Sequence, residues 1–140
     1  MKKNLRVVSV ILLFFTTISA VFGGWMLISE PDGSKLQMSA EWLTGTPFNS
    51  YLIPGIILLL ANGILSLFTA IAVLARFRIY PLLIILQSII LCGWIISQIS
   101  LIRMLSWLQI MFGFIGVILF FLGLILLRGE KSNEVKLSME

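Results

Sequence analysis

Four long uncharged runs dominate the pattern of apolar and polar positions along the chain. They cover about residues 5–28, 52–75, 79–102 and 104–127, and only the first contains a charge, Arg6 at its start. Each run of about 24 residues makes about 36 Å of α-helix, enough to cross a hydrocarbon core of about 30 Å. Because an unpaired backbone amide costs several kcal/mol in lipid, helices are the expected spanning form. The pattern predicts an all-α integral membrane four-helix bundle.

The basic residues predict how this bundle is oriented. With four spans, most cations fall on one side, and only Lys35 and Arg103 fall on the other. The larger group comprises Lys2, Lys3, Arg6, Arg76, Arg78, Arg128, Lys131 and Lys136. An excess of Lys and Arg marks the cytoplasmic side. We therefore expect both termini, including a polar and mobile tail at 129–140, to be cytoplasmic.

The segment between the first two spans has an unusual composition for a loop. Residues 41–55 read EWLTGTPFNSYLIPG, with two prolines and two glycines that interrupt a helix. The same stretch carries Trp42, Phe48 and Tyr51, which favour a membrane interface. Residues 30–50 therefore predict a short extracytoplasmic cap over the outer end of the bundle.

The N-terminus allows a second interpretation. A basic start, an apolar stretch and the sequence Ile18-Ser19-Ala20 are similar to a cleavable signal peptide. The apolar run is longer than a usual signal core, and it has no Ala-x-Ala site. Retention as the first span is therefore favoured, with cleavage as the alternative.

The composition is that of a membrane protein, and it limits the chemical activities that the chain can be expected to have. The chain is 59% hydrophobic and 11% charged, against about 25% charged residues in a typical soluble domain. The net charge of +4 is scattered at the ends of apolar runs, which argues against nucleic acid. There is no histidine, the single cysteine Cys92 lies in an apolar run, and no acid lies within a span. We therefore expect no metal, no cofactor and no enzymatic activity.

Small and polar residues inside the spans predict where helices pack. A stripe of small residues lets two helices approach closely, and embedded amides and hydroxyls usually hydrogen-bond across helices. The residues predicted to serve helix packing are Gly55, Asn62, Ser66, Gly113, Gly116 and Gly123. Packing within the bundle is favoured, and a homodimer seam is the alternative.

A candidate ligand site lies toward the outer end. Gln87, Trp94 and Gln98 share one face of the third span at i, i+7 and i+11, and we expect this face to point into the bundle. Arg103 in a tight outer turn would seek an anion. Our hypothesis is an outward-facing pocket formed by Glu41, Trp42, Trp94, Gln98 and Arg103. An aromatic belt and simple snorkelling of Arg103 are the alternatives.

A set of short motifs resembles a group of uncharacterised small four-span bacterial membrane proteins. The motifs are the stretch from Pro31 to Gly55, Arg76, Gly93-Trp94-Ile95 with Gln98, and Trp107-Leu108-Gln109. The resemblance covers about residues 31–123 and implies a bacterial inner membrane, but no activity. A looser similarity to DoxX-type membrane subunits rests on size and span number.

The sequence favours a non-enzymatic membrane protein that binds a lipid, an apolar small molecule or a partner membrane protein. The first alternative is a membrane subunit of a quinone-linked redox enzyme or a lipid-modifying enzyme. The second is a small exporter, which the lack of a buried acid disfavours.

Overall fold

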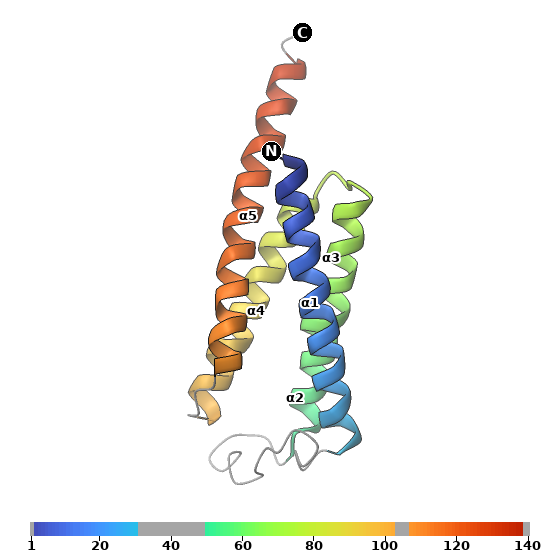
Figure 1. Cartoon of the computed structure of the whole chain (residues 1–140), viewed down its shortest axis with the longest axis vertical. Coiled ribbons are helices and arrows are strands. Elements are labelled where there is room, and N and C mark those ends of the chain that lie inside the picture. The colour runs from blue at the N-terminus through green and yellow to red at the C-terminus, as the bar shows by residue number, and fades with distance from the viewer. Residues whose placement is uncertain (1, 31–49, 103–106, 139–140) are drawn as a thin grey trace.

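All the elements that the structure describes are helical. The computed structural model describes the backbone of residues 2–30, 50–102 and 107–138, and the side chains of residues 3–30, 50–99 and 109–131. The elements are α1 (Lys2–Ser29), α2 (Leu52–Ile57), the π-helix η3 (Leu58–Ile64), α3 (Leu65–Leu74), α4 (Tyr80–Ile102) and α5 (Trp107–Ser138) (Figure 1). In the described part, four segments are long and apolar enough to cross a membrane: Lys3–Ser29, Leu52–Leu74, Tyr80–Ile99 and Gln109–Lys131. The predicted all-α four-helix bundle is confirmed.

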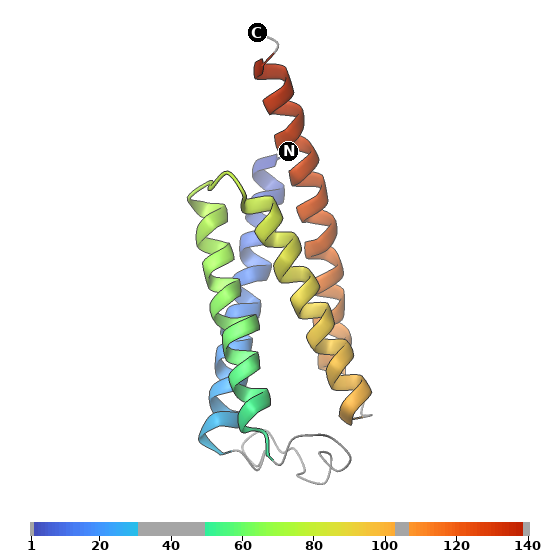
Figure 2. The same cartoon turned by 180° about the vertical axis from the view of Figure 1, so that it is seen from behind.

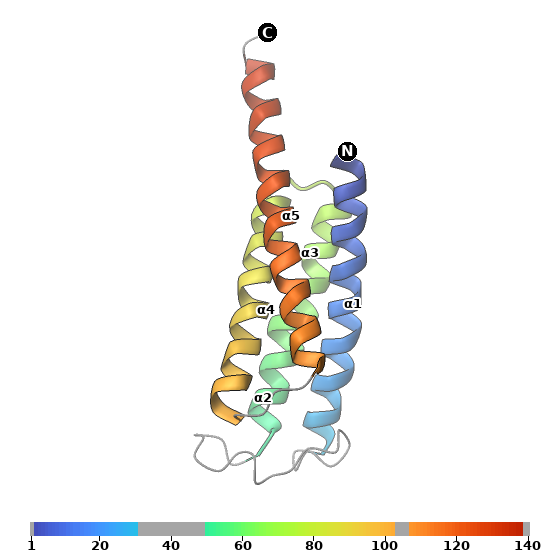
Figure 3. The same cartoon turned by 60° about the vertical axis from the view of Figure 1, so that its left-hand side comes forward.

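The four spans are arranged as two helical hairpins. One hairpin is α1 with the continuous rod α2–η3–α3, and the other is α4 with α5. α5 contacts α1 as well as α4, and α4 contacts α3 and η3 (Figure 3). The hairpins lie close together at the end that carries both termini and diverge toward the other end (Figure 2). That first end is called the terminal end below.

Apolar side chains cover the outside of the bundle as well as its core. The interior cluster includes Leu13, Ile84, Leu119 and Leu126, all fully buried. On the outside, large apolar side chains are widely exposed, with 68% for Ile18 and 64% for both Ile96 and Phe114. A soluble protein of this size would not leave so much contiguous apolar surface in water. Lipid is therefore the surrounding solvent, and the chain is a multi-pass membrane protein.

Glycines set the closest helix contacts in each hairpin. A Cβ built on Gly24 would lie 2.9 Å from the carbonyl oxygen of Gly55, so α1 and α2 touch backbone to backbone. On α5, a Cβ on Gly116 would lie 2.6 Å from Cys92 Sγ, and one on Gly123 would lie 2.6 Å from Ile85 Cγ1. No atom lies within 4 Å of the corresponding point on Gly113, although it belongs to the predicted stripe. Small residues therefore bring the helices together at Gly24, Gly55, Gly116 and Gly123.

The link between α3 and α4 begins with a helix-ending turn that normally uses glycine. The Phe77 N–H donates to the Ala72 carbonyl at 3.0 Å, and the Arg76 N–H donates to the Val73 carbonyl at 3.2 Å. These are the two hydrogen bonds of a Schellman motif, whose C′ residue is left-handed. Arg76 occupies that position with φ of 57°. A non-glycine residue there is strained by roughly 1 kcal/mol.

Two regions extend the sequence expectation. The stretch 129–140, expected as a polar tail, is helical as far as Ser138, because α5 continues beyond the apolar run. No proline interrupts it, and Glu130 is hydrogen-bonded to Tyr80 in its first turn beyond the apolar run. The second span, predicted as a uniform helix, contains the seven-residue π-helix η3. The cap at 30–50 falls almost wholly outside the described residues and stays a prediction.

Candidate functional site: a buried polar contact between the hairpins

Two side-chain amides meet where the hairpins contact each other in the membrane. Asn62 lies in η3 and Gln87 in α4, and both side chains are fully buried. The Gln87 Nε2 group donates to Asn62 Oδ1 at 3.5 Å. This distance is long compared with about 2.9 Å for a typical N–H···O bond. The pair is therefore in contact but weakly bonded.

Three polar atoms around this pair have no hydrogen-bond partner. They are Asn62 Nδ2, Gln87 Oε1 and the hydroxyl oxygen of Ser66, one turn along the same span. The other buried serine and threonine hydroxyls of the described spans donate to carbonyls of their own helix, namely those of Ser9, Thr16, Thr17, Thr69 and Ser88. Each unpaired buried polar group costs about 1–3 kcal/mol. Unmet hydrogen-bonding capacity in the described core is thus concentrated at one place, which we call the amide site (Asn62, Ser66 and Gln87).

The amide site coincides with a local change in helix geometry. The Leu65 N–H donates to the Leu60 carbonyl, five residues back, instead of the usual four. Gly63 within this segment lies against α1, where its Cβ would be 2.9 Å from Val21 Cγ2. Short π-helical segments are uncommon and often occur at functional positions. Here the π-helix contains Asn62 and directly precedes the turn with Ser66.

The stretch of α4 from Gln87 to Gln98 leads from the amide site to two members of the pocket predicted from the sequence, Trp94 and Gln98. Trp94 is half-buried and packs against the apolar core, and Gln98 is also half-buried. Gln87 and Gln98 are eleven residues apart, which is about 16 Å of helix. Glu41, Trp42 and Arg103 lie outside the described residues, so the complete outer pocket stays a prediction. The structure thus describes two of its five proposed members.

A second polar contact ties three helices together at the terminal end. The Tyr80 hydroxyl, at the start of α4, donates to Glu130 Oε1 on α5 at 2.8 Å. The guanidinium of Arg6 on α1 also lies near the Tyr80 hydroxyl. Tyr80 is only 3% exposed, so its phenol bridges α1 and α5 inside the bundle. In the sequence, Arg6 is only a topology signal, and no pattern indicates a role for Tyr80.

Replacing Tyr80 with phenylalanine is expected to lower the free energy of unfolding by about 1 kcal/mol. The change removes the hydroxyl that donates to Glu130 and lies near Arg6, and it leaves the ring packing intact. Unfolding in mild detergent, followed by tryptophan fluorescence, measures the loss. The control is Glu130→Gln, which keeps an acceptor oxygen for Tyr80 and should cost less. Equal stabilities of the Tyr80→Phe variant and the wild type would contradict the bridging role.

The described residues contain no group of three or more His, Cys, Asp or Glu side chains that could hold a metal ion. Comparison of the chain with family models, curated proteins and solved structures finds no match. The resemblance based on the sequence motifs therefore stays a prediction. The function has to be argued from the amide site and its surroundings.

Proposed function

We propose that the protein is a non-enzymatic membrane protein that holds a lipid or other apolar small molecule against the α4 face from Gln98 to Gln87. The polar end of that molecule is hydrogen-bonded at the amide site. The observation that carries the proposal is the set of three unpartnered buried atoms at Asn62, Ser66 and Gln87. The residues of α4 between Gln87 and Gln98 are mostly apolar and cover about 16 Å of helix, a length that matches part of a lipid chain.

The chemistry of the unpartnered atoms favours an alcohol as the polar end. Asn62 Nδ2 is a donor and Gln87 Oε1 is an acceptor, so a hydroxyl can accept from one and donate to the other. If the oxygen and nitrogen positions of both amides are exchanged, one donor and one acceptor again remain unpaired. The site therefore needs a ligand group that both donates and accepts, whichever way the two amides are oriented. A quinone carbonyl only accepts and would leave the acceptor unpaired. The same donor and acceptor therefore favour a lipid alcohol over the quinone-linked enzyme subunit.

The remaining parts of the proposal concern activity and placement. The chain has no histidine, and its acidic residues lie outside the four apolar runs, which supports binding without catalysis. The distribution of Lys and Arg supports cytoplasmic termini, with the Gln98 end of α4 facing outward. The motif resemblance supports a bacterial inner membrane. A molecule bound from Gln98 inward would then enter from the outer leaflet.

Native mass spectrometry from mild detergent tests this function. We expect the wild type to retain one apolar molecule per chain, with a hydroxyl group identified by fragmentation. The double substitution Asn62→Leu and Gln87→Met removes both amides while keeping similar side-chain size, and it should lower occupancy about tenfold. The control Ser97→Ala changes an exposed residue of α4 whose hydroxyl donates to the Gly93 carbonyl of its own helix. It should leave occupancy unchanged.

Three outcomes would overturn the proposal. Unchanged occupancy in the double variant would separate the bound molecule from the amide site. A quinone or a stoichiometric catalytic subunit would favour the enzyme-subunit alternative. A dimer without any bound small molecule would favour a role in helix association. Each of these species has its own mass, so one measurement distinguishes them.

A further inference from the structure

A cavity of about 300 Å³ opens between α1 and α3 at the terminal end. Its lining combines three cations, Lys3, Arg6 and Arg76, with five aliphatic residues: Val7, Val10, Ile11, Val73 and Leu74. No carboxylate is among these eight residues. The volume lies at the lower end of the range for small-molecule sites. Both charge and apolar surface are therefore available to one ligand.

The cations and the aliphatic residues of the lining lie at different distances from the terminal end. Lys3 and Arg6 belong to the first two turns of α1, and Arg76 lies in the link that follows α3. The cavity's aliphatic residues on α1 extend from Val7 to Ile11, farther from the terminal end than Lys3. A ligand in this cavity would meet cations at the end of the bundle and hydrocarbon farther in. That order is the order of a phospholipid, with its phosphate outside its acyl chains.

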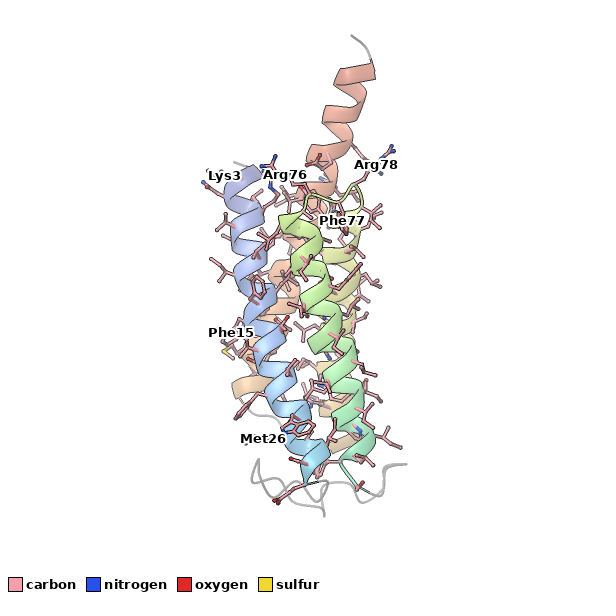
Figure 4. All side chains as sticks on the ribbon, turned by 90° about the vertical axis from the view of Figure 1, so that its right-hand side faces the viewer. Lys3, Phe15, Met26, Arg76, Phe77 and Arg78 are labelled. Carbon is pink, nitrogen blue, oxygen red and sulfur yellow. The ribbon has the colours of Figure 1, made fainter. Side chains whose placement is uncertain are left out.

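The position of Arg76 supports a role beyond marking topology. Its backbone is left-handed at φ of 57°, in a turn where glycine would be unstrained. Figure 4 shows Arg76 at the same end and on the same side as Lys3, whereas Arg78 points to the opposite side. Two arginines of one short link thus differ in placement, and only Arg76 lines the cavity.

Arg6 is held in place by a partner that is not a ligand. Its guanidinium lies near the Tyr80 hydroxyl, which donates to Glu130. A guanidinium has five N–H donors, so its contact with the phenol orients it and leaves capacity for a phosphate. The contact to Tyr80 therefore pre-organises one of the three cations.

We infer that this cavity binds the phosphate of an anionic phospholipid, with Lys3, Arg6 and Arg76 around the headgroup and the first part of an acyl chain against Val7 and Ile11. A free phosphate offers the same anion but would leave the aliphatic wall uncovered. A phospholipid would pair its phosphate with the three cations and cover the aliphatic residues with its acyl chain. This site is separate from the amide site, which lies deeper and between α4 and η3.

The test compares phosphatidylglycerol with phosphatidylcholine of identical acyl chains by native mass spectrometry. We expect the wild type to retain phosphatidylglycerol about tenfold more than phosphatidylcholine. Arg76→Gln should lower that preference about fivefold, and Arg76→Lys should keep most of it. The matched control Arg78→Gln changes a cation of the same link that does not line the cavity, and it should have no effect.

Two further variants keep the result interpretable. Arg76→Gly removes the charge but relieves the backbone strain, so lost lipid preference with unchanged or higher thermal stability excludes misfolding as the cause. The Asn62→Leu and Gln87→Met double variant should retain the phosphatidylglycerol preference, which separates this inference from the proposed function. Equal effects of Arg76→Gln and Arg78→Gln would reduce the site to general surface charge and overturn it. Displacement of the lipid by millimolar inorganic phosphate would instead identify a free-anion site.

Discussion

Alanine in place of Gly24 is expected to lower the free energy of unfolding by roughly 2 kcal/mol or more. A Cβ at this position would lie 2.9 Å from the Gly55 carbonyl oxygen and 3.0 Å from the Leu59 backbone nitrogen. Both atoms belong to the backbone of the neighbouring span, so no side-chain rotation relieves the overlap. The α1 and α2–η3–α3 segments would have to separate, which weakens every contact between them. Thermal or denaturant unfolding in a mild detergent measures this loss.

Two other glycines of the bundle provide matched controls. Neither Gly93 on α4 nor Gly113 on α5 has an atom within 4 Å of its would-be Cβ, apart from its own helix. Alanine at either position meets no neighbour and favours helix by up to about 1 kcal/mol. We therefore expect Gly93→Ala and Gly113→Ala to be neutral or stabilising. If Gly24→Ala were equally harmless, close backbone contact would not be what joins α1 to the second span.

The apolar pattern predicted the spans because lipid imposes one requirement on every spanning segment. Backbone groups must be paired within the helix, so a run of about 20 apolar residues has only one economical form. The same pattern says nothing about rotation around a helix axis, since all sides of these helices are apolar. This is why the pattern predicts packing for Gly55, Gly116 and Gly123 together with Gly113, whose would-be Cβ meets no atom within 4 Å outside its own helix. Gly24 was missed for the same reason.

The π-helix was not predictable from composition, because α- and π-helical backbones place similar demands on apolar side chains. The signal that was available is local: Asn62 and Gly63 interrupt a run of long aliphatic residues. The sequence predicts that Asn62 and Ser66 serve helix packing in the second span and that Gln87 lies on the inward face of the third. It does not predict that they meet, because side-chain contacts between spans depend on tilt and rotation. The Lys3, Arg6 and Arg76 cavity was missed likewise, since these cations were interpreted only as topology signals.

A double-mutant cycle at the amide site is expected to show strong non-additivity. Asn62→Leu alone removes the acceptor of Gln87 Nε2 and leaves a whole buried amide unpaired, at a cost of about 1–3 kcal/mol. Gln87→Met alone has the same consequence for Asn62. The double variant leaves neither amide buried, so its stability should be close to that of the wild type. The interaction energy between the two positions, which is the effect of the double variant minus both single effects, is then about 2–6 kcal/mol in magnitude.

This result would distinguish a binding site from a helix-joining contact. If the pair mainly joined the hairpins, its single long hydrogen bond would contribute about 0.6 kcal/mol, the average for such bonds in membranes, and the double variant would lose it. If the amides serve a ligand, removing both preserves or raises the stability of the ligand-free protein and lowers occupancy about tenfold. Occupancy should therefore fall in the double variant while its stability is kept or rises. A parallel loss of both, measured by unfolding and native mass spectrometry on the same sample, would show that Asn62 and Gln87 are structural.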